Sequence, residues 1–189
     1  MIPEYFAIIG AIIGSLGGFF YLRETVLGRA KPNRVTWLLW GLFPMIAFTA
    51  QRVQGVAEVS WTTFAAGFTP LIVVLVSFFN RKAYWKTERK DYVLMAAAIA
   101  GIVLWAFTRN PNLAIFFSLT ADVFASLPTF LKAWRHPETE SGTAYGISAV
   151  GFGIGMLALP AFTFENAAFL TYVFLLNAVL AVFAFRRKT

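Results

Sequence analysis

The sequence predicts an all-α integral membrane protein with seven transmembrane helices, and three observations lead to this fold class. Of the 189 residues, 59% are hydrophobic. Only 13% are charged, whereas roughly a quarter of an ordinary soluble domain is charged. The hydrophobic residues also gather in seven blocks, each close to the ~20 residues that cross a bilayer as a helix. This composition excludes a soluble enzyme and a disordered chain, and the lack of cysteine excludes a disulfide scaffold.

The seven blocks define seven predicted spans with short connections. They cover residues 3–22, 34–51, 58–79, 92–108, 112–134, 143–161 and 165–185. The first block begins with an acidic residue, Glu4, and has no basic residue before its apolar run. We therefore expect it to remain as a span and not to be cleaved as a signal peptide. The short connections favour one compact bundle without a separate soluble domain.

Lysine and arginine are distributed unevenly between the two sides of these spans. Fourteen of the 16 follow the first, third, fifth or seventh span, and only Arg52 and Arg109 lie on the other side. Because cytoplasmic loops carry the excess of basic residues, this bias places the N-terminus outside and the C-terminus in the cytoplasm, in a cytoplasmic (inner) membrane. It also accounts for the net charge of +7 with the lipid bilayer as partner and without nucleic acid.

A weak internal repeat relates the first three spans to the last three. Shifting the chain by 107 residues lays Thr36 on Thr143, Phe78 on Phe185 and Ser15 on Asp122. A single spare span between the two triplets inverts the chain once, so both triplets point the same way, as in parallel-repeat transporters. We therefore expect two parallel three-helix bundles, residues 1–80 and 111–189, joined by a basic loop and a linker helix in residues 81–110.

The second half carries the residues of a known motif. A proline stands near the basic end of the fifth span, in Ser126-Leu127-Pro128-Thr129, and the following loop reads Trp134-Arg135-His136-Pro137-Glu138 before Tyr145. With its 3+1+3 arrangement, the chain resembles the SWEET / PQ-loop superfamily over essentially its whole length. The eponymous Pro-Gln pair is Pro128-Thr129 here, and the first half has Phe20-Tyr21 at the corresponding place.

The resemblance implies an alternating-access transporter and not an enzyme. The expected activity is that of a facilitator or proton-coupled carrier for a small polar solute, such as a sugar, an amino acid or a vitamin precursor. Some members of the superfamily act as sorting receptors, so a non-transporting membrane receptor or scaffold is the alternative. Neither function implies a cofactor, and a homo-oligomer stays open.

Asp122 is the strongest candidate for a functional residue. It lies near the middle of the fifth span, where a carboxylate costs about 2.5–3.5 kcal/mol even on the insertion scale, and the other acidic residues lie at span ends or in loops. Residues of this kind usually face the bundle interior. A carboxyl group that gains and loses a proton during transport, and contacts the solute, suits the position. The structural alternative is a hydrogen bond to Ser118, Thr120 or Ser126 that only holds helices together.

Two further solute-binding candidates follow from the resemblance. In sugar-carrying SWEETs an asparagine in the third helix of a triplet binds substrate, and Asn177 in the seventh span matches it. The counterpart in the first half is Thr69, which precedes Pro70. An amide offers two donors and an acceptor to hydroxyls or a carboxylate. The alternative for Asn177 is an ordinary interhelical hydrogen bond.

Tryptophans and prolines in the spans have both functional and structural interpretations. Trp37 and Trp40 are three residues apart and so near one helical face. Trp40 could wall the solute site, whereas for Trp37 the sequence favours a headgroup anchor. Pro44, Pro70 and Pro128 interrupt spans and remove backbone donors, so they are candidate hinges of a rocking carrier. Ordinary packing bends are the alternative.

The sequence offers no set of metal ligands or catalytic residues. His136 is the single histidine and there is no cysteine, so no cluster with zinc-ligand spacing exists, and a Ser-His-Asp set within the membrane is not possible. The seventh span lacks a lysine for a retinal Schiff base. These absences favour a carrier or a receptor over an intramembrane enzyme or a photoreceptor.

Overall fold

The computed structural model describes residues 3, 5–53, 60–107, 111–159 and 161–186. Within these ranges the chain is all-helical, with seven α-helices, two short 3-10 helices and no strand. The α-helices are α1 (Tyr5–Val26), α2 (Arg34–Val53), α3 (Ser60–Phe79), α4 (Arg89–Phe107), α5 (Pro111–Arg135), α6 (Gly142–Leu157) and α7 (Phe164–Phe185). The 3-10 helices are η1 (Arg81–Ala83) and η2 (Pro137–Thr139). The all-α class predicted from the sequence is confirmed.

The ends of the helices follow from local signals. α1 runs one turn beyond its predicted end and stops before Gly28, whose φ of 70° is the left-handed conformation that glycine adopts at helix C-termini. α5 begins with Pro111 at its first position, where the missing N–H costs nothing. α6 begins after Ser141, whose hydroxyl accepts the Ala144 N–H.

Two helices in the described part of the chain are long and apolar enough to cross a membrane. They are the segments Phe6–Val26 of α1 and Ala167–Phe185 of α7, and α3 and α6 contribute shorter apolar stretches, Ala66–Phe79 and Gly142–Leu157. This is weak support for a membrane protein, because it rests on length and composition alone. Many large apolar side chains are also exposed, among them Ile8, Phe79 and Phe107, as expected of a surface that faces lipid.

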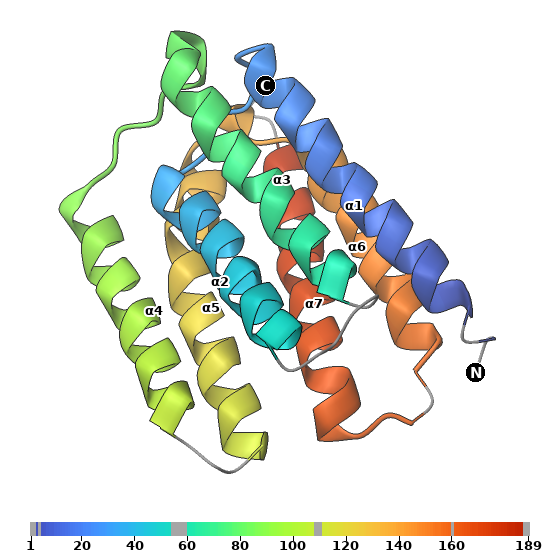
Figure 1. Ribbon diagram of the computed structural model, residues 1–189. Helices are drawn as coiled ribbons and strands as arrows, with labels where there is room; N and C mark the ends of the chain where they lie inside the picture. The colour runs from blue at the N-terminus through green and yellow to red at the C-terminus, as the bar shows by residue number, and fades with distance from the viewer. Residues whose placement is uncertain (1–2, 4, 54–59, 108–110, 160, 187–189) are drawn as a thin grey trace.

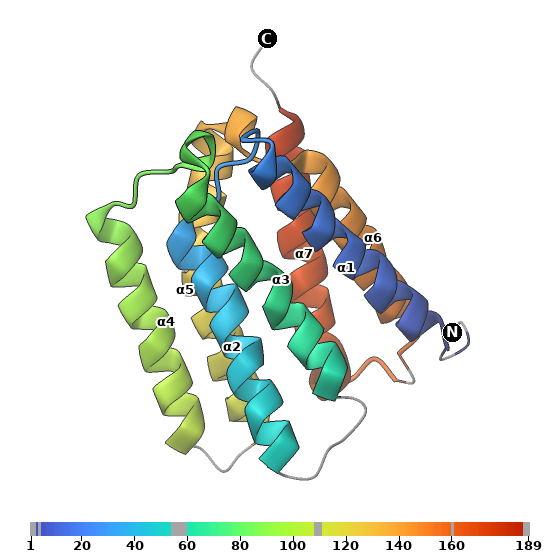
Figure 2. The same ribbon diagram turned by 45° about the horizontal axis from the view of Figure 1, so that its top comes forward.

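The helices form a ring of six with one helix outside it. α3 packs against α1 and α2, and α7 packs against α5 and α6. The two triplets meet where α1 contacts α6 and where α2 contacts α5, which closes the ring, and α4 lies outside against α5 and α2 (Figures 1 and 2). α1, α3, α5 and α7 run toward one end of the bundle, while α2, α4 and α6 run back (Figure 1).

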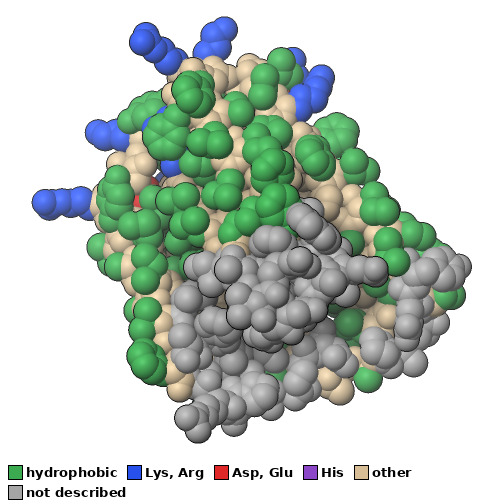
Figure 3. Space-filling view, in the orientation of Figure 1, with side chains coloured by type: hydrophobic (Ala, Val, Ile, Leu, Met, Phe, Trp, Pro, Cys, Tyr) green, Lys and Arg blue, Asp and Glu red, His purple; other side chains and the backbone are tan. Residues whose placement is uncertain are grey.

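Basic side chains gather at the end of the bundle where α1, α3, α5 and α7 finish (Figure 3). We call this the basic end; it carries residues 27–33, 80–88 and 136–141. Lys132 is one of the basic residues that the sequence assigns to this side of the spans. It is not a solvated charge, because it lies inside α5, which extends to Arg135, and its side chain is only 1% exposed. Arg109, Arg187 and Lys188 lie outside the described residues.

Candidate functional site

One face of α5 carries a line of polar side chains. Asp122, Ser126, Thr129 and Lys132 lie at positions i, i+4, i+7 and i+10 of the helix. These spacings place them on one side of an α-helix, one above the other. The line starts near the middle of α5 with Asp122 and reaches the basic end with Lys132. Two polar clusters, one at each end of this line, are the candidate functional features of the described chain.

The first cluster, the Ser126 cluster, consists of Trp40, Asp122, Ser126 and Tyr172. The Trp40 indole Nε1 donates to Ser126 Oγ over 3.2 Å. Ser126 Oγ lies 3.2 Å from the Tyr172 hydroxyl and donates to Asp122 Oδ2 over a longer 3.5 Å. The Tyr172 hydroxyl is also close enough to Asp122 to interact electrostatically with its carboxyl group. Ser126 itself is 3% exposed.

The Ser126 cluster joins three helices. Trp40 comes from α2, Asp122 and Ser126 from α5, and Tyr172 from α7. The cluster therefore sits where the first triplet meets the second. A carboxylate and two hydroxyls beside an indole N–H offer both hydrogen-bond donors and acceptors, which are the groups that a polar solute needs.

The other predicted solute-binding residues have different partners in the described chain. The Asn177 amide is half-buried and donates to the Val173 carbonyl of its own helix over 2.9 Å. Thr69 is 8% exposed and packs against Gly18, at the contact of α3 with α1. Only Trp40 and Asp122, of the four predicted residues, share a hydrogen-bonded cluster here. Pro44, Pro70 and Pro128 all lie inside helices, as predicted.

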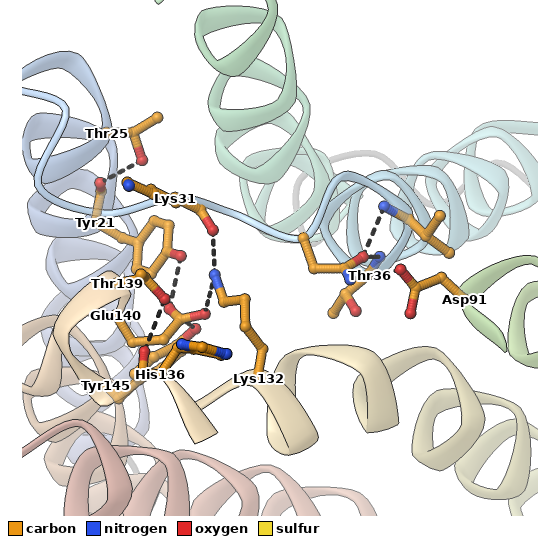
Figure 4. Close-up of polar contacts among 12 residues, drawn as sticks. Tyr21, Thr25, Lys31, Thr36, Asp91, Lys132, His136, Thr139, Glu140 and Tyr145 are labelled. Atoms are coloured by element: carbon orange, nitrogen blue, oxygen red, sulfur yellow. Dashed lines mark hydrogen bonds and ion pairs between the residues drawn. The ribbon is translucent and has the colours of Figure 1, made fainter. Parts of the chain in front are cut away.

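The second cluster, the Glu140 cluster, consists of Tyr21, Lys132, Glu140 and Tyr145 at the basic end. Lys132 Nζ lies 2.7 Å from Glu140 Oε1, and both side chains are buried. Glu140 Oε2 accepts the Tyr21 hydroxyl over 2.7 Å and the Tyr145 hydroxyl over 2.9 Å. Figure 4 shows the Lys132 side chain extending from α5 toward Glu140, with Tyr21 and Tyr145 on the other side of the Glu140 carboxylate.

A chain of aromatic rings connects the two clusters. Tyr21 packs against Trp37 with ring centroids 4.1 Å apart and ring planes tilted by 30°, and Trp37 meets Trp40 edge-on at 5.3 Å. Trp37 is 4% exposed, so the interpretation of Trp37 as a headgroup anchor is wrong. A large ring in the first turn of a span fits an interface position by sequence, but in the structure Trp37 is buried against Tyr21 of α1. Trp134, by contrast, is half-exposed and holds Arg186 over its ring.

A small cavity of about 50 Å³ opens at the basic end beside α5. Its lining includes Pro128 and Lys132 of α5, Asp91 of α4 and Trp85 before α4. This volume holds water or a small ion at most. Glu88 at its rim accepts a hydrogen bond from the Lys90 ammonium, which lowers the pKa of the Glu88 carboxyl. Among the described residues no group of three or more histidine, cysteine, aspartate or glutamate side chains is placed to hold a metal.

Sequence reasoning missed Tyr172 and the whole Glu140 cluster as functional candidates. Tyr172 stands in the apolar run of α7, and a phenol within such a run needs a hydrogen-bond partner, which is a signal that could have found it. Lys132 and Glu140 lie eight residues apart across a turn in the chain, and their charges were indistinguishable from those of solvated loops.

Comparison with known proteins gives no relative. The chain matches no family model, no curated protein and no solved structure.

Proposed function

We propose that this protein is a seven-span membrane carrier of the SWEET / PQ-loop type, which moves a small polar solute across a cytoplasmic membrane. The observation that carries the proposal is the Ser126 cluster. A carboxylate near the middle of a helix accepts a hydrogen bond from the Ser126 hydroxyl, which also contacts Tyr172 and accepts the Trp40 indole N–H from the other triplet. Carriers built from repeats bind their solutes at such a place, near the midplane where the repeats meet.

The helix packing supports the same proposal. α1, α2 and α3 have the same neighbours in their triplet as α5, α6 and α7 have in theirs, and the two contacts between triplets, α1 with α6 and α2 with α5, exchange under the repeat. Two equivalent triplets around one axis are the arrangement that allows a carrier to rock about a central site.

The proposed topology has the basic end in the cytoplasm and the N-terminus outside. The chain has no cysteine, so a single introduced cysteine reports its own exposure. Lys86→Cys, in the basic loop before α4, is expected to react with an impermeant maleimide in inside-out vesicles and not in intact cells. Reaction from outside intact cells would contradict the topology.

The proposed role of Asp122 is to carry the proton that couples transport to a proton gradient. If the Asp122 carboxyl group is protonated when the carrier closes, no unpaired charge is buried. A thermal-shift screen of sugars, amino acids and nucleosides first selects the solute, because a ligand that prefers the folded state raises its apparent stability. Uptake of that solute into proteoliposomes is expected to rise with an inward-directed proton gradient.

Asp122→Asn tests this role directly. The variant is expected to lose the dependence on the proton gradient while solute exchange continues. Glu138→Gln is the matched control, because the Glu138 side chain is 61% exposed in the loop at the basic end, and it is expected to keep the dependence. An unchanged pH response in Asp122→Asn would reduce Asp122 to a structural residue. Binding without uptake of any solute would favour a receptor or scaffold.

A further inference from the structure

The Glu140 cluster contains a buried ion pair that the proposed transport site does not use. The Lys132 and Glu140 side chains are 1% and 0% exposed, and their charged atoms are 2.7 Å apart. Removing two charges from water carries a desolvation penalty that their attraction often fails to recover, so a buried ion pair adds little to stability by itself. A well-packed apolar pair would serve stability as well. The presence of the buried ion pair therefore needs an explanation other than folding stability.

The partners of Glu140 come from both triplets. Tyr21 at the end of α1 and Tyr145 in the first turns of α6 both donate to Glu140 Oε2. Lys132 on α5 binds Glu140 Oε1 and also donates to the Lys31 carbonyl in the loop after α1. The four side chains and the loop thereby hold the two triplets together at the basic end (Figure 4).

The ion pair also stands at the end of the polar face of α5. One turn from Ser126 toward the basic end is Thr129, which is 0% exposed and whose hydroxyl has no hydrogen-bond partner among the described residues. The Trp37 indole N–H, one turn from Trp40 in the same direction on α2, is also buried without a partner in that set. α2 and α5 are antiparallel and meet at Trp40 and Ser126, so these two groups lie at the same level.

Polar groups thus continue from the Ser126 cluster toward the basic end, and the Glu140 cluster lies at the end of this polar line. We propose that the Lys132–Glu140 ion pair is the cytoplasmic gate of the carrier, and that opening it exposes the polar face of α5 to the cytoplasm. This inference rests on the proposed function. A gate made of charges suits both states, because the charges are paired when the gate is closed and hydrated when it is open.

A second lysine–glutamate pair at the same end provides a matched control. Lys90 Nζ lies 2.7 Å from Glu88 Oε2, the same separation as in the buried pair, but the two side chains are 43% and 55% exposed. An exposed pair of this kind contributes little to any equilibrium. Breaking the exposed Lys90–Glu88 pair removes the same type of ion pair but is not expected to open the gate.

A cysteine at Thr129 measures the opening. Thr129→Cys changes the side chain little and breaks no hydrogen bond of the described structure. In inside-out vesicles of the full chain, labelling of this cysteine by an impermeant maleimide is expected to be slow, and to become about tenfold faster when Glu140→Gln removes one charge of the buried pair. Lys90→Met is expected to leave the rate unchanged. Rapid labelling without Glu140→Gln, or equal rates with and without it, would overturn the gate.

Two further variants separate a gate from a structural contact. Tyr145→Phe removes one hydrogen bond to Glu140 and keeps both charges, so it tests the same opening if Glu140→Gln folds poorly; a smaller rise in labelling is expected, and no rise would count against the gate. The double variant Lys132→Met with Glu140→Leu replaces the ion pair by two apolar side chains. Hydration does not favour their separation, so they are expected to stay in contact. It is expected to fold, to stay unlabelled at position 129 and to lose uptake.

These outcomes distinguish the gate from the proposed function. Unimpaired uptake by the double variant would assign the pair a structural role only and overturn the gate. Labelling needs no solute, so faster labelling in Glu140→Gln would support the closure at the basic end even if no solute moved in any assay. In that case the carrier proposal would fail while the closing role of the ion pair stood.

Discussion

The two contacts between the triplets are equivalent under the repeat but are built differently. At the α1/α6 interface the backbones nearly touch. A methyl group added to Gly151 would lie 2.3 Å from the Gly14 nitrogen, and one added to Gly17 would lie 2.6 Å from the Ala144 carbonyl oxygen. At the α2/α5 interface the repeat places larger residues, such as Phe124 at the counterpart of Gly17, and side chains make the contact.

The difference assigns different roles to the two interfaces. Close backbone contact through small residues packs two helices tightly in a membrane, so α1 and α6 are expected to move as one body. The α2/α5 interface is bridged by the Trp40–Ser126 hydrogen bond, which single rotations of side chains can break. In a rocking carrier we therefore expect the solute path to open between α2 and α5.

The largest effect is expected from adding volume to the α1/α6 interface. The three nearest atoms to a methyl group at Gly151 are all backbone atoms of α1, so no side-chain rotation can relieve the clash in Gly151→Ala. The helices must separate, at a cost of about 1–3 kcal/mol in the free energy of unfolding. Thermal unfolding of the purified protein in detergent measures it. A variant as stable as the parent would show that this interface is not close-packed.

An intermediate effect comes from two serines that bridge the two interfaces. Ser148 Oγ donates to the Gly14 carbonyl over 3.2 Å across α1/α6, while Ser126 bridges α2 and α5. Each alanine variant is expected to lose about 0.6 kcal/mol of stability, the average for a hydrogen bond between membrane helices. Only Ser126→Ala is expected to change the uptake rate and its pH profile. Equal changes in uptake would remove the functional difference between the interfaces.

The smallest effect is expected at Gly14. A methyl group there would be 4.0 Å from the nearest atom, the Ser148 carbonyl oxygen, which is an ordinary contact. Alanine is a better helix former than glycine by up to about 1 kcal/mol, so Gly14→Ala is expected to leave stability unchanged or raise it slightly. A loss comparable to that of Gly151→Ala in the same unfolding assay would mean that the whole length of the interface is tight.

The sequence pointed to three of the four residues of the Ser126 cluster. Asp122 stood out because a carboxylate inside an apolar run is costly wherever its helix packs, and Ser126 was named among its possible partners. Trp40 stood out as a ring one turn inside a span. Ser15, by contrast, falls on Asp122 in the repeat but is exposed and bonds the Ala11 carbonyl of its own helix. A weak repeat relates positions along the chain and does not conserve the side that each helix turns inward.

The sequence by itself determined the helices and the basic end. An apolar run is a local property of the sequence, so the seven apolar blocks can be recognised without knowledge of how they pack. The helices of the structure begin and end within a few residues of these blocks. Only the tertiary structure decided that Lys132 pairs with Glu140, that Tyr172 joins Asp122, and that Trp37 packs inside. Those facts depend on how each helix is rotated and on which helix lies beside it. Neither is a local property of the chain.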